Sequence, residues 1–365
     1  MATQVNVREI ILETLLLITR DGEYSHIALK NVLDKYQYLE KRERAFITRV
    51  VEGTLERQIE IDYIINQFSK VKVNKQKPVI RTILRSSVYQ MKYMDSVPDS
   101  AICNEAVKLA GKRGFVNLKG FVNGVLRNIG RNLDKISYPD EKDQEAFISI
   151  KYSWMVKQWL KVYDEETVKM IGKAFLEEKP LTVRFDEHKI KKAELISILE
   201  KEGVTAGEVP EIPCALYLSG YDYLSALPSF CEGLYQVQDL SSMQVALWSE
   251  VRAGDQVLDV CAAPGGKAIH IAELLNGTGH VEARDLTEYK VAMIRDNIER
   301  SGLTNINAVC QDAAIYDPHK KETADIVIAD LPCSGLGVLG KKPDLRYKMN
   351  EKTEADLVEL QKKIL

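Results

Sequence analysis

Apolar residues recur every three or four positions through the first part of the chain, as they do on the buried face of an amphipathic helix. The spacing predicts helices over 10–18, 45–61, 78–94 and 101–110, and another that starts near Gly120. The segment 97–100 forms a turn with N-cap candidates before the fourth of these helices. The polar stretch 132–141, which contains Pro139, is typical of a linker. The pattern therefore predicts an all-helical N-terminal domain over residues 1–135.

The pattern changes after the linker. Residues 142–178 keep a helical spacing that includes 153–162. Residues 180–230 instead place strand-like runs at 181–185 and 215–218 around a helical run at 192–202. This mixture predicts a small α+β subdomain within a middle segment that covers 142–232.

From Gly233 onward, strand-like and helical runs alternate. Strands are predicted at 257–260, 280–284, 306–310 and 325–330, with helices between them, of which 289–301 is the clearest. This alternation is typical of a doubly wound parallel sheet, so it predicts a Rossmann-like α/β domain over 233–365. We therefore expect a multidomain protein that combines helical, small α+β and α/β parts.

The charge of the chain is unevenly distributed. The net charge is −3 at pH 7, but residues 1–140 hold 23 Lys and Arg against 16 Asp and Glu, whereas the remainder holds 27 against 37. Residues 70–135 contain 14 basic and 4 acidic residues. A basic module joined to an acidic one indicates a polyanion as the partner of the first module. A solvated helical surface would explain the same charges, and both interpretations stay open here.

Several classes of protein do not fit the sequence. No apolar run reaches about 18 residues, which argues against a membrane span. The N-terminal stretch carries Arg8, Glu9 and Glu13 and no small-residue cleavage site, so it does not resemble a signal peptide. The six cysteines and five histidines are scattered, so neither a disulfide framework nor a metal site is expected. A monomeric cytoplasmic protein is the simplest expectation.

Residues 257–267 read Val-Leu-Asp-Val-Cys-Ala-Ala-Pro-Gly-Gly-Lys, which predicts a buried strand, a small-residue loop and the start of a helix. This geometry lets α/β proteins bring backbone N–H groups to a cofactor. Gly265 and Gly266 have no Cβ, so a ligand can approach the backbone closely. Polar residues also follow the later predicted strands, namely Asp285, Asp312 and the run 330–335. Because ligands bind at the carboxyl ends of parallel strands, the sequence predicts a cofactor site there.

The loop disfavours two common classes of cofactor. The pattern G-x-G-x-x-G is absent, which argues against a nicotinamide or flavin site, and no G-x-x-x-x-G-K-[ST] loop for a nucleoside triphosphate occurs. Taken singly, Cys261 could be a small core residue, Asp285 a helix cap and Asp312 a turn residue. Together, at the ends of neighbouring strands, they favour a cofactor site.

The motifs resemble those of a known family. The runs Cys-Ala-Ala-Pro-Gly-Gly-Lys at 261–267, Asp-Leu-Pro-Cys-Ser-Gly at 330–335 and Gln-Asp-Leu-Ser-Ser at 238–242 resemble the RNA cytosine-5 methyltransferases. Asn-Glu-Ala-Val at 104–107 and Phe-Val-Asn-Gly-Val-Leu-Arg at 121–127 are similar to a NusB-type RNA-binding domain. The combination resembles the RsmB/Sun/Fmu type of bacterial small-subunit (16S) ribosomal RNA methyltransferases. This likeness covers nearly the whole chain.

The resemblance implies S-adenosylmethionine as the cofactor and a cytosine of 16S ribosomal RNA as the substrate. It places the cofactor against Cys261, Ala262, Ala263, Pro264, Gly265, Gly266 and Lys267. It also implies that Asp285 binds the ribose, that Asp312 lies near the adenine and that Asp330 lies at the methyl-transfer end. The resemblance therefore implies a class I methyltransferase domain in the C-terminal part.

The chemistry of that family needs a cysteine. A thiolate that adds to carbon 6 of cytosine turns the ring into an enamine, whose carbon 5 can then attack a methyl group. The family carries this nucleophile in a Thr-Cys motif, whereas the cysteine of its Pro-Cys motif, here Cys333, assists product release. No Thr-Cys dipeptide occurs in the sequence. We therefore expect a chain truncated at its C-terminus, with 326–329 as an open edge strand and a poorly soluble C-terminal half.

Two alternatives stay open at this point. Cys333 could itself be the nucleophile, as the Pro-Cys cysteine is in the DNA cytosine methyltransferases. Alternatively, the chain could be a non-catalytic NusB-like RNA-binding protein with a vestigial methyltransferase domain. A nicotinamide oxidoreductase fits the loop least well.

Overall fold

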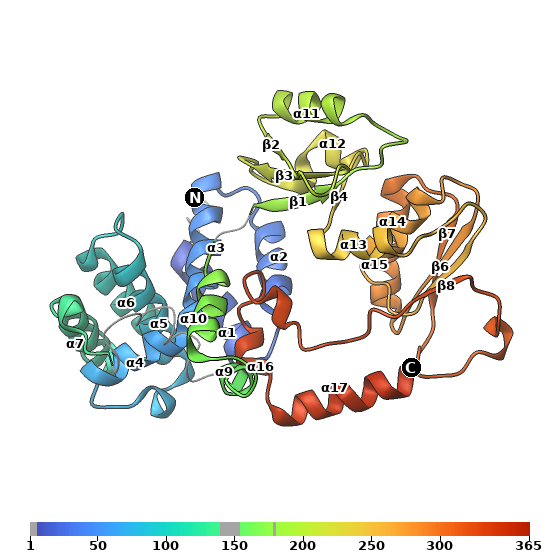
Figure 1. Ribbon diagram of the computed structural model, residues 1–365. Coiled ribbons are helices and arrows are strands. Elements are labelled where there is room, and N and C mark those ends of the chain that lie inside the picture. Colours follow the sequence, from blue (N-terminus) through green and yellow to red (C-terminus); the bar gives the residue numbers. More distant parts are fainter. Residues whose placement is uncertain (1–5, 139–153, 178–179) are drawn as a thin grey trace. The chain divides into compact units, whose positions relative to one another are not determined.

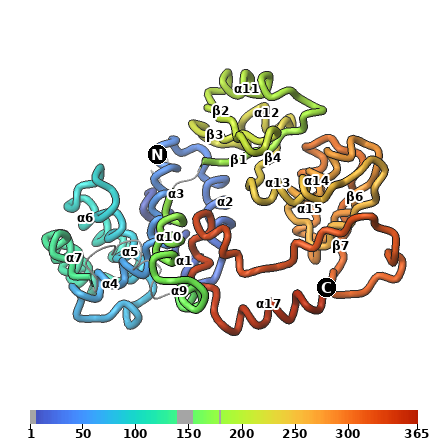
Figure 2. The backbone as a smooth tube through the Cα atoms, in the orientation of Figure 1, coloured from blue at the N-terminus to red at the C-terminus, as the bar shows by residue number. Residues whose placement is uncertain are grey.

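The computed structural model describes residues 6–138, 154–177 and 180–365 (Figures 1 and 2). Its contacts divide the chain into two units. The first comprises Met1–Glu178 together with Ser334–Thr353, and the second comprises Lys179–Cys333 together with Glu354–Leu365. Within the described residues, both β-sheets belong to the second unit. None of the described helices has the length and apolar character that a membrane span requires.

The first unit is built from amphipathic helices, which confirms the prediction for the N-terminal part. The helices are α1 Val7–Thr19, α2 Ser25–Lys35, α3 Lys41–Glu56, α4 Gln58–Phe68, α5 Pro78–Tyr93, α6 Asp99–Lys112, α7 Lys119–Gly130, α9 Trp154–Trp159, α10 Glu165–Ala174 and α16 Leu345–Lys348. Short 3-10 turns lie at η1 Val73–Lys75, η2 Val116–Leu118, η3 Leu133–Lys135 and η6 Leu336–Val338. Ile47, Ile64 and Leu84 are fully buried in the core shared by α1–α7. Burial of their apolar surface, at about 25 cal/mol per Å², stabilises the bundle.

Several helix boundaries differ from the prediction. The single helix expected over 45–61 is two helices, because Arg57 leaves helical geometry with a ψ of 12°. Helix α6 begins at Asp99 after Pro98, so Ser100 is not its N-cap. Helix α2 was not predicted, since it buries only three small or apolar side chains. Pro139 and the predicted helical residues 142–153 lie outside the described residues.

A segment from the C-terminal part of the sequence packs within the first unit. Arg346 Nη1 donates to the carbonyl of Glu56 at 2.7 Å, and the Tyr347 hydroxyl donates to the carbonyl of Leu55 at 2.7 Å. Asp344, only 2% exposed, accepts hydrogen bonds from Ser25. Residues 334–353 thus belong to the helical unit although they follow the last strand of the parallel sheet. The domain boundaries at 135, 142 and 233 stay predictions.

The second unit opens with a small antiparallel sheet. Its elements are β1 Leu181–Arg184, α11 Lys192–Lys201, β2 Thr205–Glu208, β3 Ala215–Ser219, η4 Leu224–Ala226, α12 Pro228–Cys231 and β4 Gln236–Val237. The strand order is β2-β3-β1-β4, with antiparallel pairs. The small α+β subdomain is therefore confirmed. The sequence pattern missed β2 and β4, because one reads Thr-Ala-Gly-Glu and the other has two residues.

The second sheet of this unit is parallel and carries the predicted strands. Its elements are α13 Leu240–Trp248, β5 Gln256–Asp259, α14 Gly266–Leu274, β6 His280–Asp285, α15 Glu288–Ser301, β7 Ile306–Cys310, η5 Pro318–Lys320, β8 Ile326–Ile328 and α17 Glu351–Ile364. The strand order is β7-β6-β5-β8, and every pair is parallel. Between β7 and β8 the chain forms only the short turn η5, where a helix was expected. Strand β8 lies at the edge of the described sheet, as predicted, with Val327 57% exposed.

Candidate active site

The carboxyl ends of the parallel strands meet at one edge of the sheet. Asp259 of β5 pairs with Ala283 of β6 and with Ile328 of β8. Asp285 at the end of β6 pairs with Cys310 at the end of β7. The chain order reverses at β5, which has β6 on one side and β8 on the other. Open α/β sheets bind ligands at such a switch point, at the carboxyl ends of the strands.

The loop between β5 and α14 is a tight turn held by its own backbone. The N–H of Gly265 donates to the carbonyl of Ala262 at 2.6 Å, and the N–H of Ile269 donates to the carbonyl of Gly265 at 2.8 Å. Gly265 has a φ of 104°, in the left-handed region that favours glycine. The Ala263–Pro264 peptide bond is cis. The first N–H groups of α14 have no acceptor within the helix, so they are available to a ligand at this edge.

Asp285 joins this loop to the end of β6. Its Oδ2 accepts a hydrogen bond from the N–H of Ala263 at 3.0 Å, and its Oδ1 accepts one from the N–H of Leu286 at 2.8 Å. Lys290 Nζ lies 3.0 Å from Oδ1. A carboxylate offers about four acceptor positions, so these contacts leave capacity for a ligand hydroxyl.

Lys267 joins the same loop to the motif after β8. Its Nζ lies 2.5 Å from Oδ2 of Asp330, and the two side chains are 19% and 55% exposed. Lys267 lies in the first turn of α14, whereas Asp330 follows β8 by two residues. The pair brings the two motifs that carry the sequence likeness into direct contact.

Two groups at the start of the loop, one buried and one half-buried, have shifted pKa values. Burial raises the pKa of Asp259 to about 7, although the N–H of Cys261 and the nearby Lys267 favour its ionised form. Burial, together with the charges of Asp285 and Asp259, raises the pKa of the Cys261 thiol to about 11. Since a thiol must ionise to act as a nucleophile, Cys261 is suited to packing in the loop and not to covalent catalysis.

The loop after β7 holds Asp312 in a turn and presents apolar side chains. Asp312 Oδ1 accepts a hydrogen bond from the N–H of Ala314 at 2.8 Å, so this side chain stabilises a turn. Ile315 and Tyr316 are 64% and 73% exposed, and Leu286 after β6 is 59% exposed. Sequence analysis missed these apolar side chains. Leu286 directly follows Asp285 at the end of β6, and this position is the signal that could have identified it, whereas Ile315 and Tyr316 lie further beyond β7.

Cys333 lies in the same loop as Asp330, three residues further along, and its side chain is exposed. An accessible thiol is a requirement for covalent catalysis. Within the described ranges, no group of three or more His, Cys, Asp or Glu side chains is arranged to hold a metal ion.

The helical unit carries a basic groove of its own. It has a volume of about 480 Å³ and is lined by Asn104, Val107, Lys108, Lys119, Gly120, Asn123 and Arg127 of α6 and α7. Gly120 and the neighbouring Gly124 are exposed, and a Cβ added at either would meet no atom within 4 Å. The open glycines and the three cations form a surface that a phosphate backbone can approach closely.

Three family descriptions match the chain. The NusB family matches residues 5–131, a ferredoxin-like domain of RsmF/B-like methyltransferases matches 153–222, and the 16S rRNA methyltransferase RsmB/F matches 246–365. The first match falls in the helical unit, the second includes α9, α10 and β1–β3, and the third includes the parallel sheet and the segment 334–353. The predicted fold class is therefore confirmed.

Curated proteins match over nearly the full chain. The probable ribosomal RNA small subunit methyltransferase B of Bacillus subtilis is 37% identical, and the match covers 99% of this chain and 81% of that protein. The protein of the same name from Synechocystis is 33% identical over 99% of this chain and 82% of its own length. These matches do not support the expected truncation, and they do not favour the alternative of a non-catalytic RNA-binding protein.

Solved structures share the fold. The crystal structure of PH0851 has a TM-score of 0.80 at 22% identity, covering 99% of this chain and 82% of that chain. The structure of NSun6 from Pyrococcus horikoshii with SFG has a TM-score of 0.52 at 22% identity, covering 58% of this chain and 77% of that chain. At this level of identity the likeness establishes the fold alone.

Proposed function

The chain belongs to the RsmB/F family of 16S rRNA methyltransferases, and from this premise we propose that it methylates carbon 5 of a cytosine in 16S rRNA. The observation that carries the proposal is the contact between Lys267 and Asp330. It joins the loop after β5 to the Asp-Leu-Pro-Cys-Ser-Gly motif after β8. A loop suited to a methyl donor and a motif suited to a cytosine thereby lie next to each other.

The residues at the strand ends suit S-adenosylmethionine. This cofactor carries a sulfonium cation, a ribose diol, an adenine and an amino acid carboxylate. Asp285 would bind the diol, the first N–H groups of α14 would bind the carboxylate, and Leu286 and Ile315 would contact the adenine beside Asp312. When bound, S-adenosylmethionine supplies an electrophilic methyl group.

The motif after β8 would act on the cytosine. Asp330 is positioned by Lys267, and we propose that its carboxyl hydrogen-bonds the cytosine ring and stabilises the adduct that forms when a thiolate adds to carbon 6. After carbon 5 gains the methyl group, a general base removes the proton from carbon 5. The double bond between carbons 5 and 6 then forms again and the carbon–sulfur bond breaks, which releases the thiolate. Cys333 is the accessible thiol of this motif. The target cytosine must be unstacked to reach Cys333, which favours single-stranded or loop RNA.

We propose that the basic groove of α6 and α7 contacts the RNA backbone. Lys108, Lys119 and Arg127 supply the charge, and the exposed glycines let the phosphates approach the helix. Within the basic segment 70–135, this proposal places the RNA contact on one surface, the groove of α6 and α7. A ribosomal RNA substrate is consistent with a cytoplasmic enzyme.

The test is methyl transfer to 16S rRNA by the full chain, with methyl-labelled S-adenosylmethionine and analysis of the digested nucleosides. We expect the label in 5-methylcytidine, and we expect Asp330→Asn to abolish it. Asp296→Asn, an exposed carboxylate on α15, is the matched control and should keep activity. Label at another position of the nucleoside would overturn the cytosine-5 assignment.

The covalent step has its own test. RNA that contains 5-fluorocytidine keeps its fluorine at carbon 5, so the sulfur adduct should persist through denaturation. A persistent adduct between RNA and protein is expected with the wild-type chain. Loss of the adduct in Cys333→Ser would show that Cys333 is the nucleophile. If Cys333→Ser instead accumulated an adduct with RNA that contains ordinary cytidine, Cys333 would act in product release.

A further inference from the structure

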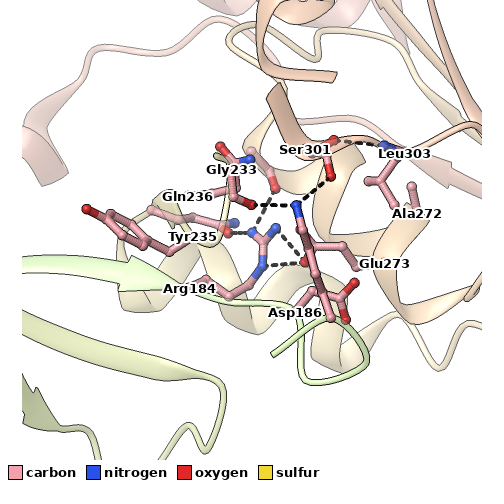
Figure 3. Close-up of polar contacts among 12 residues, drawn as sticks. Arg184, Asp186, Gly233, Tyr235, Gln236, Ala272, Glu273, Ser301 and Leu303 are labelled. Carbon is pink, nitrogen blue, oxygen red and sulfur yellow. Dashed lines mark hydrogen bonds and ion pairs between the residues drawn. The ribbon is translucent and has the colours of Figure 1, made fainter. Parts of the chain in front are cut away.

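A buried arginine from the small antiparallel sheet contacts α14. This helix follows residues 260–265, which we call the cofactor loop. Arg184, the last residue of β1, is fully buried. Its Nε donates to Oε2 of Glu273 at 2.9 Å, and its Nη2 lies 2.7 Å from the same oxygen (Figure 3). Its Nη1 donates to Oε1 of Gln238 and, at 3.3 Å, to the carbonyl of Gly266. One guanidinium therefore connects β1, the segment before α13 and both ends of α14.

The contacts of Arg184 define where α14 lies and how it is rotated. Gly266 is the first residue of α14 and Glu273 is seven residues later, so both lie on the same face, two turns apart. The planar guanidinium holds its donors in a fixed arrangement. A shift or rotation of α14 would break at least one of these contacts. The position of the loop that precedes Gly266 depends on them in turn.

Gln238 completes the arrangement. It is 5% exposed, its Nε2 donates to Ser242 Oγ at 3.1 Å, and a Cβ added to Gly266 would lie 3.7 Å from its side chain. The backbone of Gln238 is held by Thr182 of β1, whose hydroxyl donates to the Gln238 carbonyl at 2.6 Å. The Gln-Asp-Leu-Ser-Ser run thus has a structural explanation that the proposed chemistry does not supply.

The charge of Arg184 acts on two ionisable residues of α14, Glu273 and His270. Burial raises the pKa of Glu273, and Arg184 opposes that shift. The same arginine, after burial, lowers the pKa of His270, one turn from Gly266, to about 2. Burial is the larger cause of both shifts, and the guanidinium contributes to each. Removing the arginine would take away the cation that is hydrogen-bonded to the buried Glu273.

We propose that Arg184 is a positioning residue for S-adenosylmethionine, acting through Gly266 and α14 to hold the cofactor loop in its binding conformation. The proposal rests on the proposed function, because it assumes that this loop binds the methyl donor. It gives the small antiparallel sheet a role in cofactor affinity, although none of its own residues lies in the loop.

The test is Arg184→Lys in the full chain, because lysine keeps the charge opposite Glu273 but cannot reach all three partners. Titration calorimetry with S-adenosylmethionine should show a Kd raised roughly 10- to 100-fold, the size expected when a distant change displaces a binding group by about 1 Å. Without ligand, the amides of 261–270 should exchange hydrogen faster than in the wild type. RNA affinity should not change.

Lys189→Met is the matched control. Lys189 Nζ donates to the carbonyls of Glu232, Gly233 and Ser301 at 3.3, 3.1 and 3.3 Å, so it joins the small α+β part to the last residue of α15. Its loss should loosen the packing but leave the Kd for S-adenosylmethionine within about twofold. An equal effect of both variants would overturn the proposal, since it would show general loosening.

A second variant covers the case that Arg184→Lys does not fold. Gln238→Ala keeps the Arg184–Glu273 ion pair and removes one partner of Nη1, so a several-fold weaker affinity is expected. Wild-type affinity in a folded Arg184→Lys or Gln238→Ala variant would overturn the proposal. If the wild-type chain bound no S-adenosylmethionine, the proposed function would fail, while the exchange rates would still decide whether Arg184 orders the loop.

Discussion

Asp285 accepts a hydrogen bond at 3.0 Å from the backbone N–H of Ala263, so the carboxylate assigned to the ribose also holds the cofactor loop. In Asp285→Asn, one of the two backbone donors at this side chain would face an amide NH₂ in place of an oxygen. Hydrogen bonds to a charged acceptor contribute about 1.5–3 kcal/mol, so we expect S-adenosylmethionine to bind roughly 10- to 100-fold more weakly. Titration calorimetry measures the change.

The control for this prediction is Asp296→Asn, which removes an exposed carboxylate on the neighbouring helix α15. It should leave the affinity unchanged. Equal affinity in the wild type and Asp285→Asn would show that the carboxylate does not contact the cofactor.

Replacing Lys267 should separate catalysis from stability. The Lys267–Asp330 pair is partly exposed, and such pairs contribute about 0–1 kcal/mol to stability. Lys267→Met should therefore melt near the wild-type temperature. Its kcat should fall about tenfold or more, because Asp330 loses the cation that orients it toward the cytosine. A variant with an unchanged kcat would contradict the role assigned to this pair.

The raised pKa of Asp259 predicts a dependence of stability on pH. The folded chain keeps this carboxyl protonated up to about pH 7, whereas the unfolded chain releases the proton near its ordinary value of 3.8. The folded state therefore binds more protons between these values, and stability falls as the pH rises toward 7. Asp259→Asn, which resembles the protonated form, should gain stability relative to the wild type by up to about 1.4 kcal/mol per pH unit.

Denaturant unfolding of both chains at pH 5, 6, 7 and 8 checks this prediction. Burial also raises the pKa of Glu52 in α3 to about 7, but this residue is present in both chains and its effect cancels in the difference. The difference should grow from pH 5 to 7 and level off above that. A difference independent of pH would show that Asp259 ionises normally.

The parallel sheet could be predicted because its strands are short segments with apolar residues, separated along the chain by helical or turn segments. Asp285 and Asp330 could be placed at one edge because parallel strands share the direction of their carboxyl ends. The same reasoning did not single out Leu286, since an exposed apolar residue has no periodic signal. It also wrongly joined two helices over 45–61, because neither Gly nor Pro stands at the break at Arg57 to mark it in the sequence.

Contacts between residues far apart in the chain could not be predicted from the sequence. Arg184 and Glu273 are 89 residues apart, and Ser25 and Asp344 are 319 residues apart. Each of these residues is polar, so hydropathy alone predicts exposure. Burial becomes favourable only when the partner is present, and the partner is defined by the fold.

The basic groove predicts a dependence of RNA binding on salt. Replacing Lys108, Lys119 and Arg127 by Gln should weaken binding of a single-stranded 16S rRNA fragment, because each cation that binds a phosphate releases counterions. The slope of log Kd against log salt should fall by roughly 0.7 for each phosphate that is no longer neutralised. Lys30→Gln, which changes a lysine of α2 that is 74% exposed, is the control and should keep the slope. An unchanged slope in the triple variant would exclude the groove as an RNA-binding surface.

Asp344 should stabilise the segment 334–353 within the helical unit. It accepts a hydrogen bond from the Ser25 N–H at 3.3 Å and one from the Ser25 hydroxyl, and Lys348 Nζ lies 3.1 Å from its Oδ2. Asp344→Asn places an amide NH₂ among these donors in a site that is 2% exposed. We expect the free energy of unfolding to fall by about 2 kcal/mol and the amides of 334–353 to exchange faster. Asp95→Asn, an exposed carboxylate between α5 and α6, should change neither quantity. Slow exchange retained in Asp344→Asn would mean that Arg346 and Tyr347 hold the segment without it.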